Sequence, residues 1–176
     1  MLDKLTTLVQ PWADLYSSNT ALSTAVLVVH VLSMFIAGGM AIGADRAILR
    51  AVAGSGESAR AVVADLAMTH TVVIGALSVT AVSGVALFTS DLATFAVSKV
   101  YWAKMLTVAA LLLNGLRLRR SESALMRPLV NVPLYTTEMP TAAFPLKEWS
   151  TVRSAAAVSL ALWCLVVVLG VVLMNV

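Results

Sequence analysis

The side chains of this 176-residue chain that could do chemistry in an apolar setting are its histidines and methionines. His30 stands in the run VLVVHVLSMFIAGGM (residues 26–40), where nearly every neighbour is apolar or small. A neutral imidazole is a common ligand of haem iron. His30 and Met34, one helical turn apart, form a soft nitrogen–sulfur pair of the kind that suits Cu(I). Met105 and His70 are further candidate cofactor ligands.

The sequence leaves three interpretations of His30 open. In the first, it is a neutral histidine hydrogen-bonded to a Ser or Thr on a neighbouring helix, with a structural role only. In the second, it is the axial ligand of a b-type haem. In the third, it binds copper together with Met34.

The composition indicates the environment of these residues. The chain is 60% hydrophobic and 12% charged, with a mean hydropathy of +0.92, whereas an ordinary soluble domain carries about 25% charged residues. The single cysteine, Cys164, excludes an internal disulfide. The chain carries no nucleic-acid-binding motif, and no nucleophile–base–acid set that would predict a stand-alone enzyme. We therefore expect one integral membrane domain over residues 1–176.

Four stretches with few or no charges are long enough to cross a hydrocarbon core, which needs about 20 helical residues. They predict transmembrane helices near 21–44, 64–89, 98–117 and 154–175. Before them, LDKLTTLVQPWADLY (residues 2–16) has apolar residues at helical spacing. This pattern predicts a short amphipathic helix in the interface, broken or started at Pro11. The expected fold class is all-α, a four-transmembrane-helix bundle with an N-terminal amphipathic interfacial helix.

Lysine and arginine are distributed unequally about these four spans. The loops after the first and third helices hold nine: Arg46, Arg50, Arg60, Arg117, Arg119, Arg120, Arg127, Lys147 and Arg153. The other side holds three. The positive-inside rule therefore predicts the inner (plasma) membrane with both termini non-cytoplasmic. It also predicts a long cytoplasmic loop over 118–153, and a short outer turn over 89–98.

Depth along the helices decides whether His30 and His70 can share one haem. Counted from the inner boundary, marked by Asp45 and Asp65, His30 lies 15 residues deep and His70 five. At 1.5 Å per residue the difference is roughly 15 Å along the axis. We therefore expect no haem ligated by both histidines of one chain. A haem on His30 would take Met105, or His30 of a second subunit, as its other ligand.

Lys104 stands a few residues inside the third predicted span. Its long side chain can extend to the outer headgroups, and Tyr101 and Trp102 beside it are aromatics typical of that level. We therefore predict that all three are membrane-interface residues.

Two features are expected to hold the helices together. Asp45, Arg46 and Asp65 cluster at the inner boundary, and a structural ion pair between Arg46 and Asp65 is predicted to tie the first two helices together there. Gly39 and Gly43 form a small-xxx-small pair, which would allow a second helix to approach closely.

Several segments resemble known membrane proteins. HVLSMFIAGGMAIGADRAIL (30–49) resembles the first helix of an uncharacterised bacterial family of four-helix integral membrane proteins. VSGVALF (82–88), VYWAKMLTVAALLLNGL (100–116) and RSAAAVSLALWCLVVVLG (153–170) are similar to its later helices. The wider resemblance is to CopD-like and cytochrome b561-like membrane domains, in which intramembrane histidines bind haem or assist metal handling. With only two histidines at different depths, a two-haem module of the b561 type is not expected.

These observations predict a small multi-spanning membrane protein, a redox-associated subunit that binds a b-type haem through His30 and takes part in electron transfer. The alternatives are a cofactor-free accessory or structural subunit of a larger membrane complex, and copper handling through His30 and Met34. The expected partners are the lipid bilayer and either further copies of the chain or a larger membrane complex. Segment 118–153 and the face of Gly39 and Gly43 are the surfaces expected to contact that complex.

Overall fold

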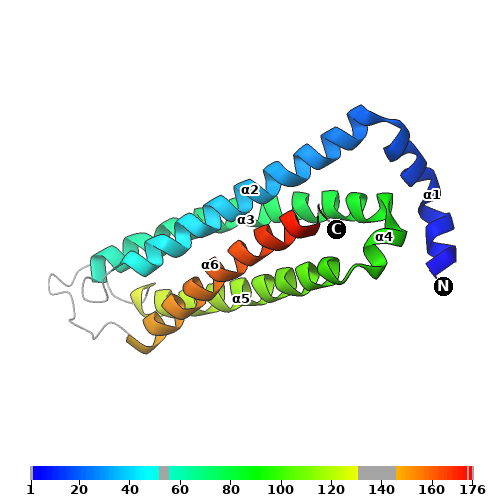
Figure 1. The fold of residues 1–176 in the computed structure, drawn as a ribbon. Coiled ribbons are helices and arrows are strands. Elements are labelled where there is room, and N and C mark those ends of the chain that lie inside the picture. The colour runs from blue at the N-terminus through cyan, green and yellow to red at the C-terminus, as the bar shows by residue number, and fades with distance from the viewer. Residues whose placement is uncertain (1, 52–55, 131–145, 174, 176) are drawn as a thin grey trace.

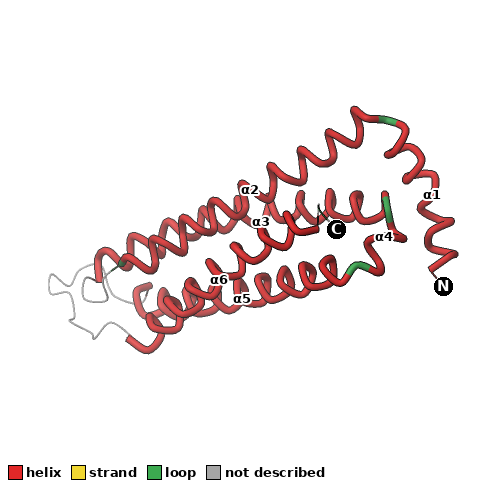
Figure 2. Tube along the Cα trace, in the orientation of Figure 1, coloured by secondary structure: helices red, strands yellow, loops and turns green. Residues whose placement is uncertain are grey.

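In the computed structural model, every regular element of the described residues is an α-helix (Figures 1 and 2). The backbone is described for residues 2–51, 56–130, 146–173 and 175, and side chains for 4–51, 69–121, 149–173 and 175. The helices are α1 (Leu2–Ser18), α2 (Thr20–Arg50), α3 (Gly56–Ser90), α4 (Leu92–Val97), α5 (Lys99–Val130) and α6 (Leu146–Leu173). The all-α fold class predicted from the sequence is thereby confirmed.

Three of these helices contain stretches long and apolar enough to cross a membrane: Thr20–Arg50, Thr69–Ser90 and Trp149–Leu173. The shortest has 22 residues, which at 1.5 Å per residue is roughly 33 Å, against a hydrocarbon core of about 30 Å. Large apolar side chains point outward along the bundle; Phe35 is 76% exposed and Val82 74%. An outer surface of this kind requires a lipid environment, and the chain is therefore an integral membrane protein.

The long helices form two antiparallel hairpins. α2 packs along α3, α5 packs along α6, and the hairpins join where α2 contacts α6 (Figure 1). α1 turns away at the end where α2 begins, and the indole Nε1 of Trp12 donates a hydrogen bond to the Ala86 carbonyl of α3 at 2.9 Å. The short α4 links α3 to α5 at the same end.

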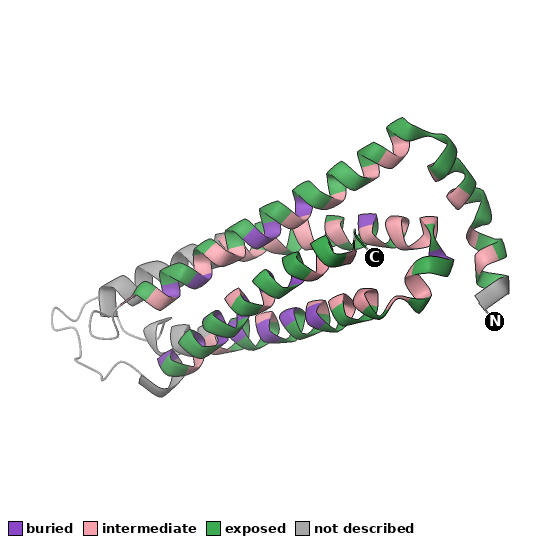
Figure 3. Cartoon of the chain, in the orientation of Figure 1, coloured by how far each residue is buried: buried purple, intermediate pink, exposed green. Residues whose placement is uncertain are grey.

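The buried residues concentrate toward the opposite end of the bundle (Figure 3). An end core consists of Ile48, Leu118, Trp149, Val152, Ala155 and Ala156. A middle core consists of Ala37, Leu111 and Trp163. A Cβ on Gly38 would lie 3.1 Å from a Trp163 ring carbon, so the indole packs directly on the α2 backbone. Since lipid is itself apolar, close packing of this kind is what holds membrane helices together.

Side-chain caps set where two of the helices begin. The Asn19 side chain accepts a hydrogen bond from the Leu22 amide at 3.0 Å, which starts α2. The Asp91 carboxylate accepts one from the Thr94 amide at 3.3 Å, which starts α4. Each cap satisfies an amide that has no partner within its own helix.

The predicted loop over 118–153 is wrong at both of its ends. α5 continues as helix to Val130, and α6 already begins at Leu146. The reason is that hydropathy marks where an apolar stretch ends, whereas the helix continues through polar residues with good helix propensity, such as Arg119 and Arg120. The rest of the predicted loop, 131–145, lies outside the described residues.

Two smaller predictions at the other end are also wrong. α1 is a single helix with Pro11 inside it, not a helix broken or started there. Proline removes one amide donor but keeps a helical φ, so an exposed helix can continue past it. The turn predicted over 89–98 contains α4, because Asp91 supplies the cap that starts a new helix.

Candidate functional site around His30

A ladder of polar side chains joins α2 to α3. His30 Nδ1 lies 3.0 Å from the Ser83 hydroxyl oxygen, and the Ser33 and Thr80 hydroxyl oxygens lie 2.8 Å apart. Ser33 lies three residues after His30 on α2, and Thr80 lies three residues before Ser83 on α3. Because the two helices are antiparallel, one register brings both pairs together. A hydroxyl partner for His30 on a neighbouring helix agrees with the first interpretation of the sequence.

Gly84 lets the imidazole lie directly against α3. A Cβ built on Gly84 would be 3.3 Å from His30 Cε1 and 3.7 Å from Nδ1. Any larger residue would therefore displace a ring that is half-buried in the bundle. Sequence reasoning missed Ser83, Thr80 and Gly84, although small residues at helical spacing in VTAVSGV (79–85) were a signal for a close helix contact.

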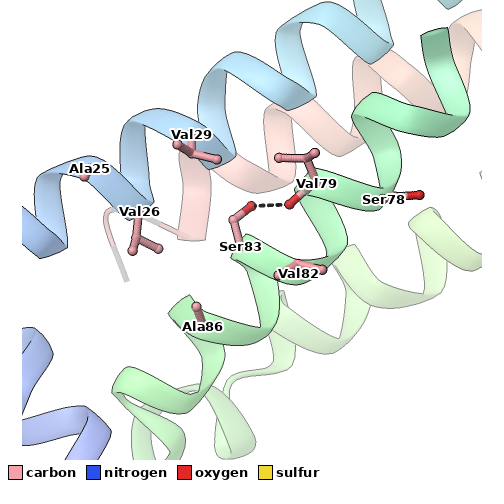
Figure 4. A pocket seen from close by; sticks show the side chains of 8 residues that line it. All are labelled: Ala25, Val26, Val29, Ser78, Val79, Val82, Ser83 and Ala86. Carbon is pink, nitrogen blue, oxygen red and sulfur yellow. Dashed lines mark hydrogen bonds between the residues drawn. The ribbon is translucent and has the colours of Figure 1, made fainter.

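The contacts of Ser83 favour one of the two tautomers that its contact with His30 Nδ1 allows. The Ser83 hydroxyl has two backbone carbonyls of its own helix as acceptors for its single proton, Val79 O at 2.8 Å (Figure 4) and Thr80 O at 3.1 Å. The Ser83 oxygen is then an acceptor toward His30. We therefore assign the proton to Nδ1, which leaves the lone pair on Nε2.

Lys104 brings a positive charge to the same part of the bundle. Its side chain is half-buried, and its Nζ lies 3.8 Å from where a Cβ on Gly170 of α6 would be. The ammonium is close enough to interact electrostatically with His30. Among the described residues it has no ion-pair or hydrogen-bond partner. The side chain is turned toward α6 near the last turns of that helix. That Lys104 lies at the membrane interface stays a prediction.

The aromatic neighbours of Lys104 connect helices. The Tyr101 ring of α5 stacks on Phe88 of α3, with centroids 4.9 Å apart and planes at 14°. Trp102 is 53% exposed, and its indole Nε1 donates to the Ala96 carbonyl at 2.9 Å. These contacts connect three helices, α3, α4 and α5, toward the end of the bundle where His30 lies.

His70 is not brought to His30. It stands on α3 thirteen residues from Ser83, the partner of His30. At 1.5 Å per residue this separation is roughly 20 Å. The half-buried His70 ring instead lies near enough to Arg119 of α5 to interact with its charge.

The two candidate methionine ligands differ in their surroundings. Met34 is partly buried and packs against the middle core that contains Trp163. Met105 follows Lys104 on α5 and is half-buried. In the described part of the chain, no three His, Cys, Asp or Glu side chains gather in a way that could hold a metal ion.

A groove of about 500 Å³ runs between α2 and α3 beside the polar ladder (Figure 4). It is lined by Ala25, Val26, Val29, Ser78, Val79, Val82, Ser83 and Ala86. Ser83 belongs both to this groove and to the His30 hydrogen bond. The volume lies within the range of small-molecule sites, and the lining suits an apolar ligand or a lipid chain.

Of the charged cluster predicted at the other end of the bundle, the structure describes the side chains of Asp45 and Arg46. Asp45 turns inward and is hydrogen-bonded by the Ser159 side chain of α6. Arg46, the next residue, is exposed, since successive residues point about 100° apart around a helix. The predicted pairing of Arg46 with Asp65 lies outside the described side chains.

The fold, the apolar outer surface and the internal polar ladder define the class as a helical integral membrane protein. Comparison with protein-family models, with curated proteins and with solved structures finds no match to this chain.

Proposed function

We propose that the protein is a small redox-associated membrane subunit in which His30 is the axial ligand of a b-type haem. The observation that supports this most directly is the His30–Ser83 hydrogen bond at 3.0 Å. A metal-ligating histidine typically donates its other ring N–H to a fixed acceptor, which sets its tautomer and orientation. The assigned tautomer gives His30 this arrangement, with Nε2 as the iron ligand.

Lys104 favours haem over copper as the group on His30. The ammonium interacts with His30 and has no acidic partner among the described residues. A haem brings two propionates, either of which could pair with Lys104. A bare copper ion would add a second positive charge without a carboxylate to offset it. Met34, the other proposed copper ligand, is engaged with the middle core.

In this proposal the chain holds the haem through a few named side chains. His30 binds the iron, Ser83 orients His30, and Lys104 pairs with a propionate. Met105, or His30 of a second copy, would supply the other iron ligand. When bound, the haem supplies one-electron transfer, and the apolar helices exclude water from its surroundings.

The proposal also covers the membrane topology, beyond the three apolar helices described above. We propose that the first half of α5 is a fourth span, since it packs along α6, and that α1 lies in the interface, since Leu5, Leu8 and Leu15 are exposed. The basic residues at the ends of α2 and α5 would then face the cytoplasm, with the protein in a plasma membrane.

The test of this orientation uses single cysteines at residues 4 and 120 in a Cys164→Ser background. An impermeant maleimide should label residue 4 in whole cells, and residue 120 only after lysis; the reverse pattern would refute the orientation.

An absorption spectrum of the purified protein tests the haem proposal. We expect a Soret band after purification in detergent from haem-replete cells, with about one haem per chain or per two chains. His30→Ala should abolish the band, while the matched control His70→Ala should retain it. Ser83→Ala should keep the fold and weaken haem retention, because the imidazole loses its orienting acceptor. A folded wild-type protein without a Soret band would refute the proposal.

One observation favours a second candidate, a cofactor-free accessory subunit. The Ser83 hydrogen bond and the Gly84 contact already give His30 a role in packing α2 on α3. Gly39 and Gly43 are exposed, and a Cβ on either would meet no atom within 4 Å. In this alternative that face packs against another membrane protein. A colourless protein that co-purifies with a stoichiometric membrane partner, and loses it on Gly39→Leu, would support this candidate.

A further inference from the structure

Asp45 is unusual among the acidic residues of this chain. It lies on α2 near the end opposite α1, and only 2% of its surface is exposed. The other acidic side chains that the structure describes, Asp14 and Asp91, are exposed. A carboxyl group placed this deeply in a membrane bundle requires a physical explanation.

The Asp45 carboxyl group has too few partners for a full negative charge. The Ser159 side chain supplies one hydrogen bond. The other oxygen, Oδ2, has no hydrogen-bond partner in the part of the chain that the structure describes, and it is inaccessible to solvent. One turn further along α2 stands Ile48 of the end core, and the residues one turn before Ser159 on α6 are the buried Ala155 and Ala156. An ionised carboxylate in such surroundings is strongly disfavoured.

No cation among the described side chains offsets the charge. The charged and titratable side chains described on α2, α3, α5 and α6 at this end are Arg46, Arg50, His70, Arg117, Arg119, Arg120 and Arg153. The six arginines are exposed, and Arg153 reaches the Leu49 carbonyl, at 3.5 Å, and not the carboxyl group of Asp45. The half-buried His70 lies near Arg119. Asp45 therefore forms no ion pair with the residues that the structure describes.

A buried amide of α5 at this end already has a hydrogen-bond partner. The Asn114 amide of α5 donates to the Ala155 carbonyl at 2.8 Å. A metal ion at Asp45 would need about six oxygen ligands, whereas this turn of α6 offers only the Ser159 hydroxyl and small apolar side chains. A proton needs no such ligand set. It neutralises the carboxylate and leaves only a dipole in the apolar surroundings.

We infer that Asp45 is a reversible proton-binding site built into the contact between α2 and α6. The observations that carry the inference are its burial, the unpartnered Oδ2 and the absence of a neighbouring cation among the described residues. The site is separate from the proposed haem ligand. His30 is fifteen residues away on the same helix, roughly 22 Å along its axis.

A hydrophobic carbodiimide tests this site in the wild-type protein. Such a reagent adds to a neutral carboxylic acid in an apolar setting, and the adduct rearranges to a stable N-acylurea that retains the whole reagent with no leaving group. We expect dicyclohexylcarbodiimide to label Asp45 in the folded protein in liposomes, with labelling that falls as the pH is raised. Mass spectrometry of peptides locates the adduct, so no variant is needed for this step.

Matched variants sharpen the result. Asp45→Asn, which keeps the size of the side chain and can still accept from Ser159, should abolish the labelling, and Asp91→Asn should leave it unchanged. Infrared spectra of the wild-type protein should contain the carbonyl band of a neutral carboxylic acid, and Asp45→Asn should lack it. An unlabelled Asp45 in folded protein, or labelling and an infrared band that do not change with pH, would overturn the inference. A missing Soret band would refute the haem proposal and leave this site unaffected.

Discussion

Replacing Gly84 by alanine is the most direct perturbation of the contact between α2 and α3. The new Cβ would lie 3.3 Å from His30 Cε1 and 3.7 Å from Nδ1, so either the ring or α3 must move by a few tenths of an ångström. Overpacking a well-packed contact typically costs about 1–3 kcal/mol. Alanine also has a higher helix propensity than glycine, by about 1 kcal/mol.

Gly75→Ala is the matched control. Gly75 lies on the same helix, and a Cβ there would meet no atom within 4 Å. It should therefore show only the propensity gain. We expect Gly84→Ala to be less stable than Gly75→Ala by about 1–3 kcal/mol in the free energy of unfolding, measured by circular dichroism during denaturation in mixed micelles.

A double-mutant cycle assigns this difference to the imidazole. His30→Ala removes the ring that the new methyl group meets, so Gly84→Ala should cost less in that background, with a coupling of about 0.5–3 kcal/mol. If Gly84→Ala and Gly75→Ala are equally stable, or if the cost of Gly84→Ala is unchanged without the imidazole, then His30 does not pack on α3 as described.

Three further substitutions test the packing and the caps, with the same denaturation assay unless stated. Trp163→Ala should lower the free energy of unfolding by about 3–5 kcal/mol, because the indole fills the middle core, whereas Trp102→Ala, at a 53% exposed position, should cost far less; equal effects would contradict the assignment of the core. Asn114→Ala should cost about 1–3 kcal/mol, since it removes the buried hydrogen bond to the Ala155 carbonyl, and an unchanged stability would show that this bond is absent. Asn19→Ala should cost about 1 kcal/mol and speed amide hydrogen exchange in the first turn of α2 only; uniform exchange along α2 would argue against the cap.

The polar ladder between α2 and α3 lies at a different level of the bundle from the two apolar cores, although Asp45 and Asn114 are buried at the level of the end core. The His30–Ser83 and Ser33–Thr80 pairs lie toward the end where α1 and α4 stand, and the two apolar cores occupy the middle and the opposite end. A polar side chain that contacts another helix can form its hydrogen bond with a different partner instead. The tight apolar contacts, by contrast, hold α2 against α6. A ligand site is therefore more easily accommodated at the polar end.

Helix existence was predictable because the apolar stretches are long and their charges sparse. The ends were not, since a helix needs backbone hydrogen bonds and suitable residues, and both continue past the apolar stretch at Arg119 and Arg120. The short α4 was missed because its start depends on a cap by Asp91 that composition alone does not reveal. The proline at position 11 was given too much weight as a helix breaker.

The sequence by itself determined that this chain is a helical membrane protein, because a helix satisfies its backbone hydrogen bonds locally and hydropathy acts on each stretch separately. It also placed His30 in a run of apolar and small residues. Only the tertiary structure decided which neighbours the polar side chains meet: Ser83 and Gly84 against His30, Gly170 beside Lys104, and Ser159 against Asp45. The physical reason is that residue spacing gives direction around one helix, whereas a partner depends on the register and rotation of another.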